Sequence, residues 1–163
     1  MSTPPDFSLI SSRSEFHEAL RAAFTEAAAQ GCRDIWLCDI DYADWPLNEP
    51  ALIDDLTQWA KAYRKLTLIA RHFDEFARRH ARWVAWRRTW SHIVECRANA
   101  ELEAGKMPTM LLAPGLVVVR LVDPVRYRGS VSRSPADAIQ GRELIDAVLQ
   151  RSEEAFPVTS LGL

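Results

Sequence analysis

The amino-acid sequence predicts an α/β fold, with a mainly parallel β-sheet, helices on both faces of the sheet and a β-hairpin late in the chain. Short continuous apolar segments, which are typical of strands covered on both faces, alternate with longer segments of helical periodicity. Such alternation favours a parallel sheet, because each helix carries the chain back to the starting edge of the next strand. The length of 163 residues fits one domain, which we expect to span 1–163.

The elements of the first half follow from periodicity and from residues that begin or end helices. A short apolar strand at 7–10 precedes a helix that should begin after Ser12, where Glu15 completes a capping box, and end at Gly31. The same criteria predict two more strands, at 35–38 and 66–70, and two more helices, at 50–64 and 74–90.

In the second half, Pro114-Gly115 interrupts an apolar stretch, which indicates a tight turn between two antiparallel strands. The apolar tail at 156–163 is expected to pack on its own domain or on a partner. The other expected elements are a strand at 92–97, loops at 99–108 and 125–135, the hairpin strands at 110–113 and 116–122, and an amphipathic helix at 138–155.

Composition excludes several classes of protein. The chain is 48% hydrophobic and 26% charged, which is typical of a globular protein, and its net charge of −2 argues against non-specific coating of nucleic acid or anionic membranes. The spacing of Cys32, Cys38 and Cys96 matches no zinc or redox motif, so we expect reduced thiols and no bound metal or cofactor. The first residues do not resemble a signal peptide, and the longest apolar run is too short to cross a bilayer. We therefore expect a cytoplasmic protein with no membrane contact.

Three segments carry a family resemblance, FSLISSRSEF at 7–16, WRRTWSH at 86–92 and QRSEEAFP at 150–157. Together with the order of strands and helices, they resemble bacterial domains of uncharacterised function that have the fold of one half of the phospholipase D superfamily. Members of that group occur beside, or fused to, GNAT-type acetyltransferase domains, which implies an acetyltransferase-type protein partner. Halves of the superfamily pair face to face, which implies a homodimer.

Active members of this superfamily carry the motif H-x-K-x4-D near the late hairpin. Its histidine forms a covalent intermediate with phosphorus, and its lysine stabilises negative charge on the phosphate oxygens. The corresponding segment here, Lys106 to Leu111, contains no histidine, and H-x-K occurs nowhere in the chain. The resemblance therefore implies a degenerate, non-catalytic binding or interaction module of unknown ligand.

The acidic segment Asp39-Ile40-Asp41 supports an alternative function, because it follows a predicted strand. Haloacid-dehalogenase-type phosphatases place two aspartates around Mg²⁺ in this position, and open α/β sheets bind ligands at the carboxyl ends of their strands. Ala43 stands where that family has threonine or serine. The segment therefore indicates either a divergent Mg²⁺-dependent phosphohydrolase or an acidic loop held by turn hydrogen bonds.

Arginines after the hairpin are the main candidates for contacts with an anionic small molecule. They would lie with the loop 39–45 at a shared cleft, or else form ion pairs with the aspartates of that loop. The candidate ligand-binding residues are Asp39, Asp41, Trp45, Arg120, Arg126 and Arg128.

A second group of arginines, Arg82, Arg87 and Arg88, is interleaved with tryptophans and suggests a nucleic-acid-binding accessory protein as a further alternative. The helical spacing of Trp83, Trp86 and Trp90 places the tryptophans on one face, as in a buried stripe. The arginines would then be solvated or ion-paired charges on the rest of the helix.

Overall fold

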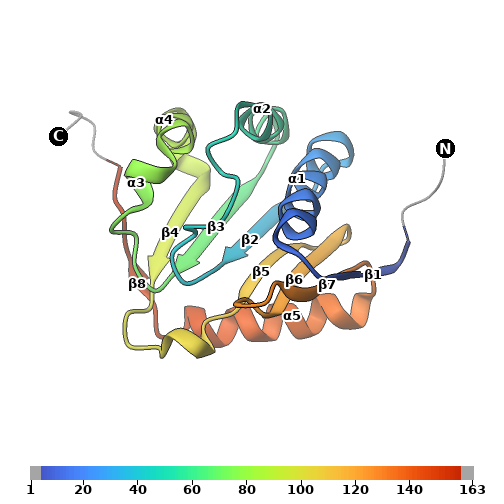
Figure 1. Ribbon diagram of the computed structural model, residues 1–163. Helices are drawn as coiled ribbons and strands as arrows, with labels where there is room; N and C mark the ends of the chain where they lie inside the picture. Colours follow the sequence, from blue (N-terminus) through green and yellow to red (C-terminus); the bar gives the residue numbers. More distant parts are fainter. Residues whose placement is uncertain (1–4, 159–163) are drawn as a thin grey trace.

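The computed structural model describes residues 5–158, which form one eight-stranded sheet with helices on both faces (Figure 1). Helices α1 to α4 lie on one face and α5 lies on the other. In chain order the elements are β1 (Phe7–Ile10), α1 (Arg13–Gln30), β2 (Asp34–Cys38), α2 (Pro50–Trp59), β3 (Lys65–Ala70), α3 (Phe76–Arg79), α4 (Ala81–Trp90), η1 (Ser91–Ile93), β4 (Val94–Ala98), η2 (Ala104–Lys106), β5 (Thr109–Ala113), β6 (Val117–Asp123), β7 (Arg128–Ser132), α5 (Pro135–Leu149) and β8 (Glu153–Glu154).

The strand order is β1-β7-β6-β5-β2-β3-β4-β8, and the prediction of a mainly parallel sheet is wrong. Among the described strands only β2–β3 and β3–β4 pair in parallel, whereas the other five neighbouring pairs are antiparallel. No α-helix returns the chain between β4 and β5. Strand β5 therefore begins at the edge of the sheet where β4 ends, and it runs antiparallel to β2.

The late hairpin is confirmed as β5 and β6, but the polar loop expected at 125–135 contains the additional strand β7. Its sequence, RGSVS, has few of the apolar residues that mark a strand. The last helix ends at Leu149, earlier than expected, and a short strand β8 follows it. Pro135 stands in the first turn of this helix, where it requires no hydrogen-bond acceptor.

The start and end of α1 agree with the sequence prediction. The Ser12 side chain accepts a hydrogen bond from the backbone N–H of Glu15 at 3.2 Å, and Gly31 ends the helix with a φ of +77°. The helix expected at 74–90 is instead broken at His80 into α3 and α4. The His80 ring is buried, and its Nε2 lies 2.8 Å from the backbone oxygen of Tyr42. This contact holds the junction between α3 and α4 against the loop that follows β2.

The sheet separates two hydrophobic layers. The larger one packs α1, α2 and α4 on the sheet, with large side chains such as Phe16, Trp59 and Trp83 almost completely buried. The smaller one lies under α5 and includes Met110 and Ile145. Burial of each such side chain contributes about 1.5–3 kcal/mol, so both layers hold the sheet in place.

The two ends of the chain are described only in part, because the structure covers residues 5–158. The described part of the tail packs on its own chain, where the Phe156 ring stacks on Phe73 at 5.4 Å. The expectations for 1–4 and 159–163 lie outside the described residues. Across the described residues no helix has both the length and the apolar character needed to cross a membrane.

Substitution of Gly129 tests the close approach of β6 and β7. A Cβ atom at this position would lie 1.9 Å from the backbone oxygen of Arg120, whereas a Cβ atom at Gly105 would have no neighbour within 4 Å. We expect Gly129→Ala to lower the free energy of unfolding by at least about 2 kcal/mol, because the strands must separate. Gly105→Ala should change it by less than about 0.5 kcal/mol. Urea unfolding followed by circular dichroism measures both; equal effects would contradict this strand pairing.

Candidate functional site

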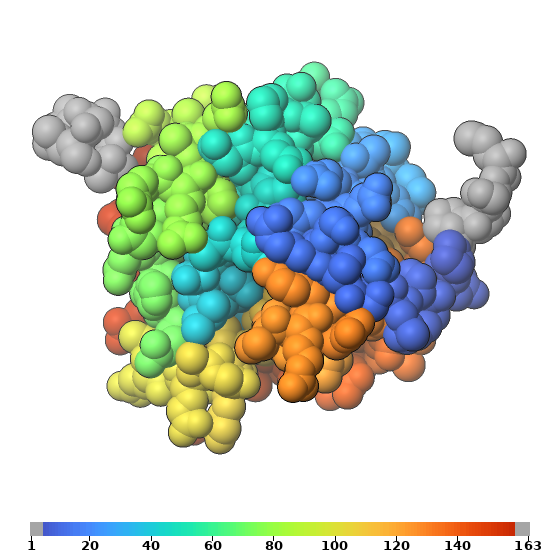
Figure 2. Space-filling model, viewed as in Figure 1, coloured from blue at the N-terminus to red at the C-terminus, as the bar shows by residue number. Residues whose placement is uncertain are grey.

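A cavity of about 450 Å³ lies at the edge of the sheet where β2 ends and β5 begins. In Figure 2 the segment around η2 (yellow) and the turn between β6 and β7 (orange) lie side by side at the lower edge of the molecule. We name this space the Asp39 cavity. Its lining consists of Asp39, Ile40, the segment 104–109, the residues Arg120, Leu121, Val122, Pro124 and Val125, and Leu144 of α5.

Asp39 has a structural role in addition to its place in this cavity. One carboxylate oxygen accepts the backbone N–H groups of Asp41 at 3.3 Å and Tyr42 at 2.8 Å. The other oxygen accepts the hydroxyl of Thr109 at 2.7 Å. The side chain therefore ties the loop after β2 to the first residue of β5. Burial raises the pKa of Asp39, although these hydrogen bonds oppose the shift.

The rest of the acidic loop is held by turn hydrogen bonds, as one of the two interpretations of the sequence expects. Asp41 accepts the backbone N–H of Ala43 at 3.0 Å. Tyr42 has a φ of +59°, and its buried hydroxyl donates to the backbone oxygen of Ile69 at 2.7 Å. Trp45 is 4% exposed and packs edge-on against Tyr42, so it belongs to the core and does not reach the cavity.

The aspartates do not fit the magnesium site that the phosphohydrolase alternative requires. Both oxygens of Asp39 already face N–H or O–H donors, whose hydrogens point to where a cation would bind. Within 5–158 there is no group of three or more histidine, cysteine or acidic side chains placed to hold a metal ion. The geometry therefore favours a loop-stabilising role for Asp39 and Asp41.

The cavity brings together two cationic side chains, Arg120 of β6 and Lys106 of η2. Among the described residues neither forms an ion pair or a side-chain hydrogen bond. Sequence reasoning selected Arg120 but missed Lys106. A signal existed, since Lys106 is the first residue of the segment that the family resemblance aligns with the H-x-K motif.

The other two arginines that follow the hairpin do not line the cavity. Arg126 is exposed and pairs with Asp123 at 3.5 Å. Arg128 is also exposed and donates to the backbone oxygen of Ser11 at 2.9 Å. The structure therefore unites Asp39 with Arg120 and places Trp45, Arg126 and Arg128 elsewhere.

A cluster around Asp44 positions the turn beside this cavity, and sequence reasoning did not identify it. Arg13 of α1 pairs with Asp44 at 2.7 Å, and the hydroxyl of Tyr127 donates to the same carboxylate. The His17 ring lies 2.6 Å from the backbone oxygen of Asp44. The hydrogen bond to Asp44 raises the pKa of Tyr127. Helix α1, the acidic loop and the β6–β7 turn are thereby joined at one point.

The candidate nucleic-acid residues occupy different environments. Arg82 is exposed and donates from its backbone and side chain to Asn48, and Arg88 is exposed without such a contact among residues 5–158. Trp83 and Trp86 are buried, as their spacing predicts. Arg87 is only 7% exposed, so it is not available to a surface ligand beside the other two.

No family model and no curated protein matches the chain. Solved structures are similar to it, among them TrmBL2 and Nuc. TrmBL2, described as an archaeal chromatin protein with a novel mode of DNA binding, has a TM-score of 0.68, 13% identity and coverage of 95% of this chain. Nuc from Salmonella typhimurium, a phospholipase D family member, has a TM-score of 0.58 and 9% identity, with 94% of this chain and 100% of Nuc covered.

The fold is phospholipase-D-like. At these identities the likeness extends to the fold alone. The chain spans 56% of the length of TrmBL2, so it corresponds to little more than half of that protein.

The raised pKa of Asp39 predicts a pH-dependent contribution to stability. A carboxyl group whose pKa is raised by folding stabilises the folded chain fully below its ordinary pKa of about 4, and this contribution is lost as the pH rises through the raised value. In Asp39→Asn the contribution is absent, whereas the amide can still accept the N–H of Tyr42. We therefore expect the stability of the unmodified chain, relative to Asp39→Asn, to fall as the pH rises above the ordinary pKa and through the raised pKa of Asp39.

Urea unfolding of both proteins across this pH range measures the difference. Asp41→Asn is the matched control, because Asp41 is less buried than Asp39. A difference between Asp39→Asn and the unmodified chain that does not vary with pH would show that folding leaves the pKa of Asp39 unchanged.

Proposed function

We propose that the chain is a non-catalytic, phospholipase-D-like module that binds an anionic ligand in the Asp39 cavity. The observation that carries this proposal is the presence of two cationic side chains, Lys106 and Arg120, that line one cavity without a carboxylate partner among the described residues. A cation that lines a cavity without a counter-charge attracts anions. The planar guanidinium group can donate two parallel hydrogen bonds to two oxygens of one carboxylate or phosphate group.

The single carboxylate of the cavity opposes this attraction only weakly. Asp39 is engaged in three internal hydrogen bonds, and its pKa is raised by burial, which lowers the cost of its neutral form. Apolar side chains, Met107, Leu121 and Leu144, form much of the remaining wall. This combination suits an organic anion whose charged group reaches Arg120.

The lining also supports a binding role over a hydrolytic one. It contains no histidine, and the Thr109 hydroxyl is buried and donates to Asp39. The position of the superfamily's H-x-K motif thus holds Lys106 without a histidine nucleophile.

Substitution of Arg120 tests the ligand site, with inorganic phosphate and citrate as probes at a constant ionic strength set by sodium chloride. Binding to the folded chain raises its melting temperature. We expect Arg120→Gln to lose this rise, because the guanidinium supplies the charge-assisted hydrogen bonds. Arg126→Gln is the matched control, since Arg126 lies outside the cavity and pairs with Asp123.

Equal rises for Arg120→Gln and the unmodified chain would place the anion elsewhere. Turnover of a generic phosphodiester that is lost in EDTA and in Asp39→Ala would favour the phosphohydrolase alternative instead.

Nucleic-acid binding is the second candidate function. Exposed arginines of α3 and α4, Arg79, Arg82 and Arg88, belong to a segment from Phe76 to Val94 that contains no acidic residue. Such a basic surface on a chain of net charge −2 is suited to phosphate contacts. TrmBL2, whose fold is similar, is described as binding DNA.

Salt dependence tests this second candidate. Binding to a double-stranded DNA oligonucleotide, followed by fluorescence anisotropy, should weaken steeply as the salt concentration rises. The double substitution Arg82→Gln and Arg88→Gln should reduce the slope of log K against log salt by about 1 for each phosphate group that the variant no longer binds. The double substitution Arg126→Gln and Arg128→Gln, which removes two positive charges outside this segment, controls for net charge. Salt-independent or undetectable binding would remove this candidate.

The resemblance to phospholipase-D-like domains also motivates proposals about assembly and location. We propose a homodimer and an acetyltransferase-type protein partner, which light scattering and co-purification can test. A cytoplasmic location agrees with Cys32, Cys38 and Cys96, which are all free thiols. Detection of the chain in an exported fraction would contradict it.

A further inference from the structure

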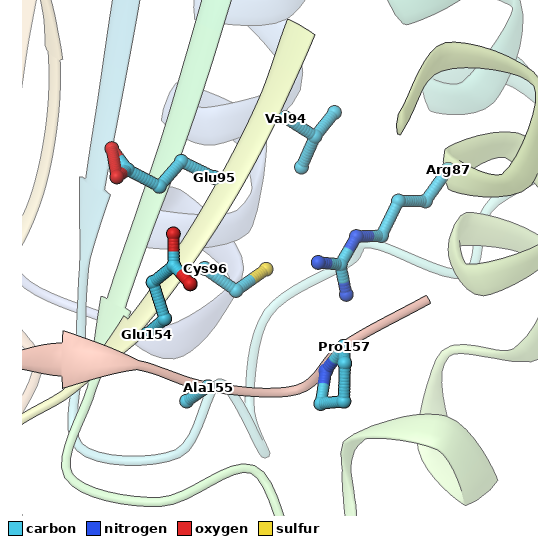
Figure 3. Close-up of a pocket in the computed structure, with 7 residues that line it drawn as sticks. All are labelled: Arg87, Val94, Glu95, Cys96, Glu154, Ala155 and Pro157. Carbon is cyan, nitrogen blue, oxygen red and sulfur yellow. The ribbon is translucent and has the colours of Figure 1, made fainter. Parts of the chain in front are cut away.

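A second cavity, of about 360 Å³, lies at one end of the strand order, beside β4 and β8 (Figure 3). We name it the Arg87 cavity. It lies between helix α4, strand β4 and the segment that follows β8, and none of its residues lines the Asp39 cavity. Its lining consists of Arg87, Val94, Glu95, Cys96, Glu154, Ala155 and Pro157.

The guanidinium group of Arg87 is buried in this cavity with few partners. It donates one hydrogen bond, from Nη1 to the backbone oxygen of Phe156, and it lies over the Phe156 ring at 5.1 Å. The side chain is 7% exposed, and its Nε has no acceptor within residues 5–158. A buried cation without a counter-ion is costly, because desolvation of the charge is not offset by a paired carboxylate.

The acidic residues of the lining do not neutralise Arg87. Figure 3 shows Glu95 and Glu154 on one side of the cavity and the guanidinium on the other. Glu95 is engaged by Lys65 at 3.4 Å and by Arg97 at 3.3 Å. These two carboxylates add negative charge to the side of the cavity away from Arg87, which disfavours ligands with several negative charges.

Cys96 does not supply the missing anion either. Its sulfur points toward Arg87 in Figure 3, and the side chain is 3% exposed. Burial raises the pKa of the Cys96 thiol to about 12, against the opposing effect of Arg87. At neutral pH the thiol is therefore uncharged and behaves as a small apolar group in the wall.

We propose that the Arg87 cavity binds a short-chain monocarboxylate, whose carboxylate pairs with the buried guanidinium of Arg87. The remaining wall, formed by Val94, Cys96, Ala155 and Pro157, is apolar or uncharged and accommodates a short aliphatic chain. A single cation faced by two carboxylates matches one negative charge better than a phosphate or a polyanion. This site is independent of the anionic ligand proposed for the Asp39 cavity.

The test is a titration with sodium butyrate at constant ionic strength, followed by the Nε–H resonances of the arginines in the full chain. Butanamide, which has the same shape without the charge, is the matched ligand control. We expect a saturable shift of the Arg87 resonance with butyrate, a weaker response to inorganic phosphate and none with butanamide. Arg87→Gln should weaken butyrate binding, measured by calorimetry, by at least about tenfold. Arg88→Gln, at the exposed neighbouring position, should leave it unchanged.

A second variant keeps the test decisive if Arg87→Gln fails to fold. Cys96→Leu retains the guanidinium but places a larger side chain in the cavity wall beside it, so it should weaken butyrate binding. The proposal is overturned by an Arg87 resonance that does not shift or shifts linearly, by equal binding of butyrate and butanamide, or by unchanged affinity in Cys96→Leu. Phosphate binding tighter than butyrate would overturn the choice of a monocarboxylate. Loss of binding in Arg120→Gln would assign the ligand to the Asp39 cavity and overturn this proposal alone.

Discussion

The carboxylate of Asp39 is the contact on which the candidate site depends. It joins the backbone of the loop after β2 to the hydroxyl of Thr109, at the first residue of β5. These two strands are neighbours in the sheet, yet the residues joined are 70 positions apart in the chain. Removal of this carboxylate would leave two backbone N–H groups and one hydroxyl without their acceptor, and the wall of the Asp39 cavity would lose its anchor. The buried carboxyl group thus holds the end of β2 beside the start of β5.

Local features of the fold could be predicted from the sequence, whereas the direction of the strands could not. Ser12 and Gly31 mark the ends of α1 through their own side chain and backbone preferences, so neighbouring residues carry the information. The direction of β5 depends on the connection from β4, which contains no α-helix that would return the chain to the other edge of the sheet. The residues of β5 themselves are compatible with either direction. Strand β7 was missed because Arg128–Ser132 is polar, and its place is fixed by pairing with β1 and β6.

The candidate site was predictable to a similar, partial extent. Asp39 was selected because it follows a buried strand, and the structure places it beside Arg120. The burial of Arg87 could also have been inferred, since it lies four residues after Trp83 and residues at that spacing share a helix face. What could not be inferred is that Phe156, far away in the sequence, would supply both an acceptor and an aromatic ring to this arginine.

The sheet contains strand pairs that are close together in the sequence and strand pairs that are far apart in it. Strands β5, β6 and β7 form a meander of local antiparallel pairs, whereas β2–β5 and β1–β7 join residues from opposite halves of the chain. Closing such long loops costs more chain entropy than forming a hairpin, so the meander can assemble first and these junctions later. The Asp39 cavity lies at the β2–β5 junction, with walls from both halves. Neither half of the chain forms this cavity by itself. A ligand that binds there would therefore bind only to chains in which β2 and β5 have already paired.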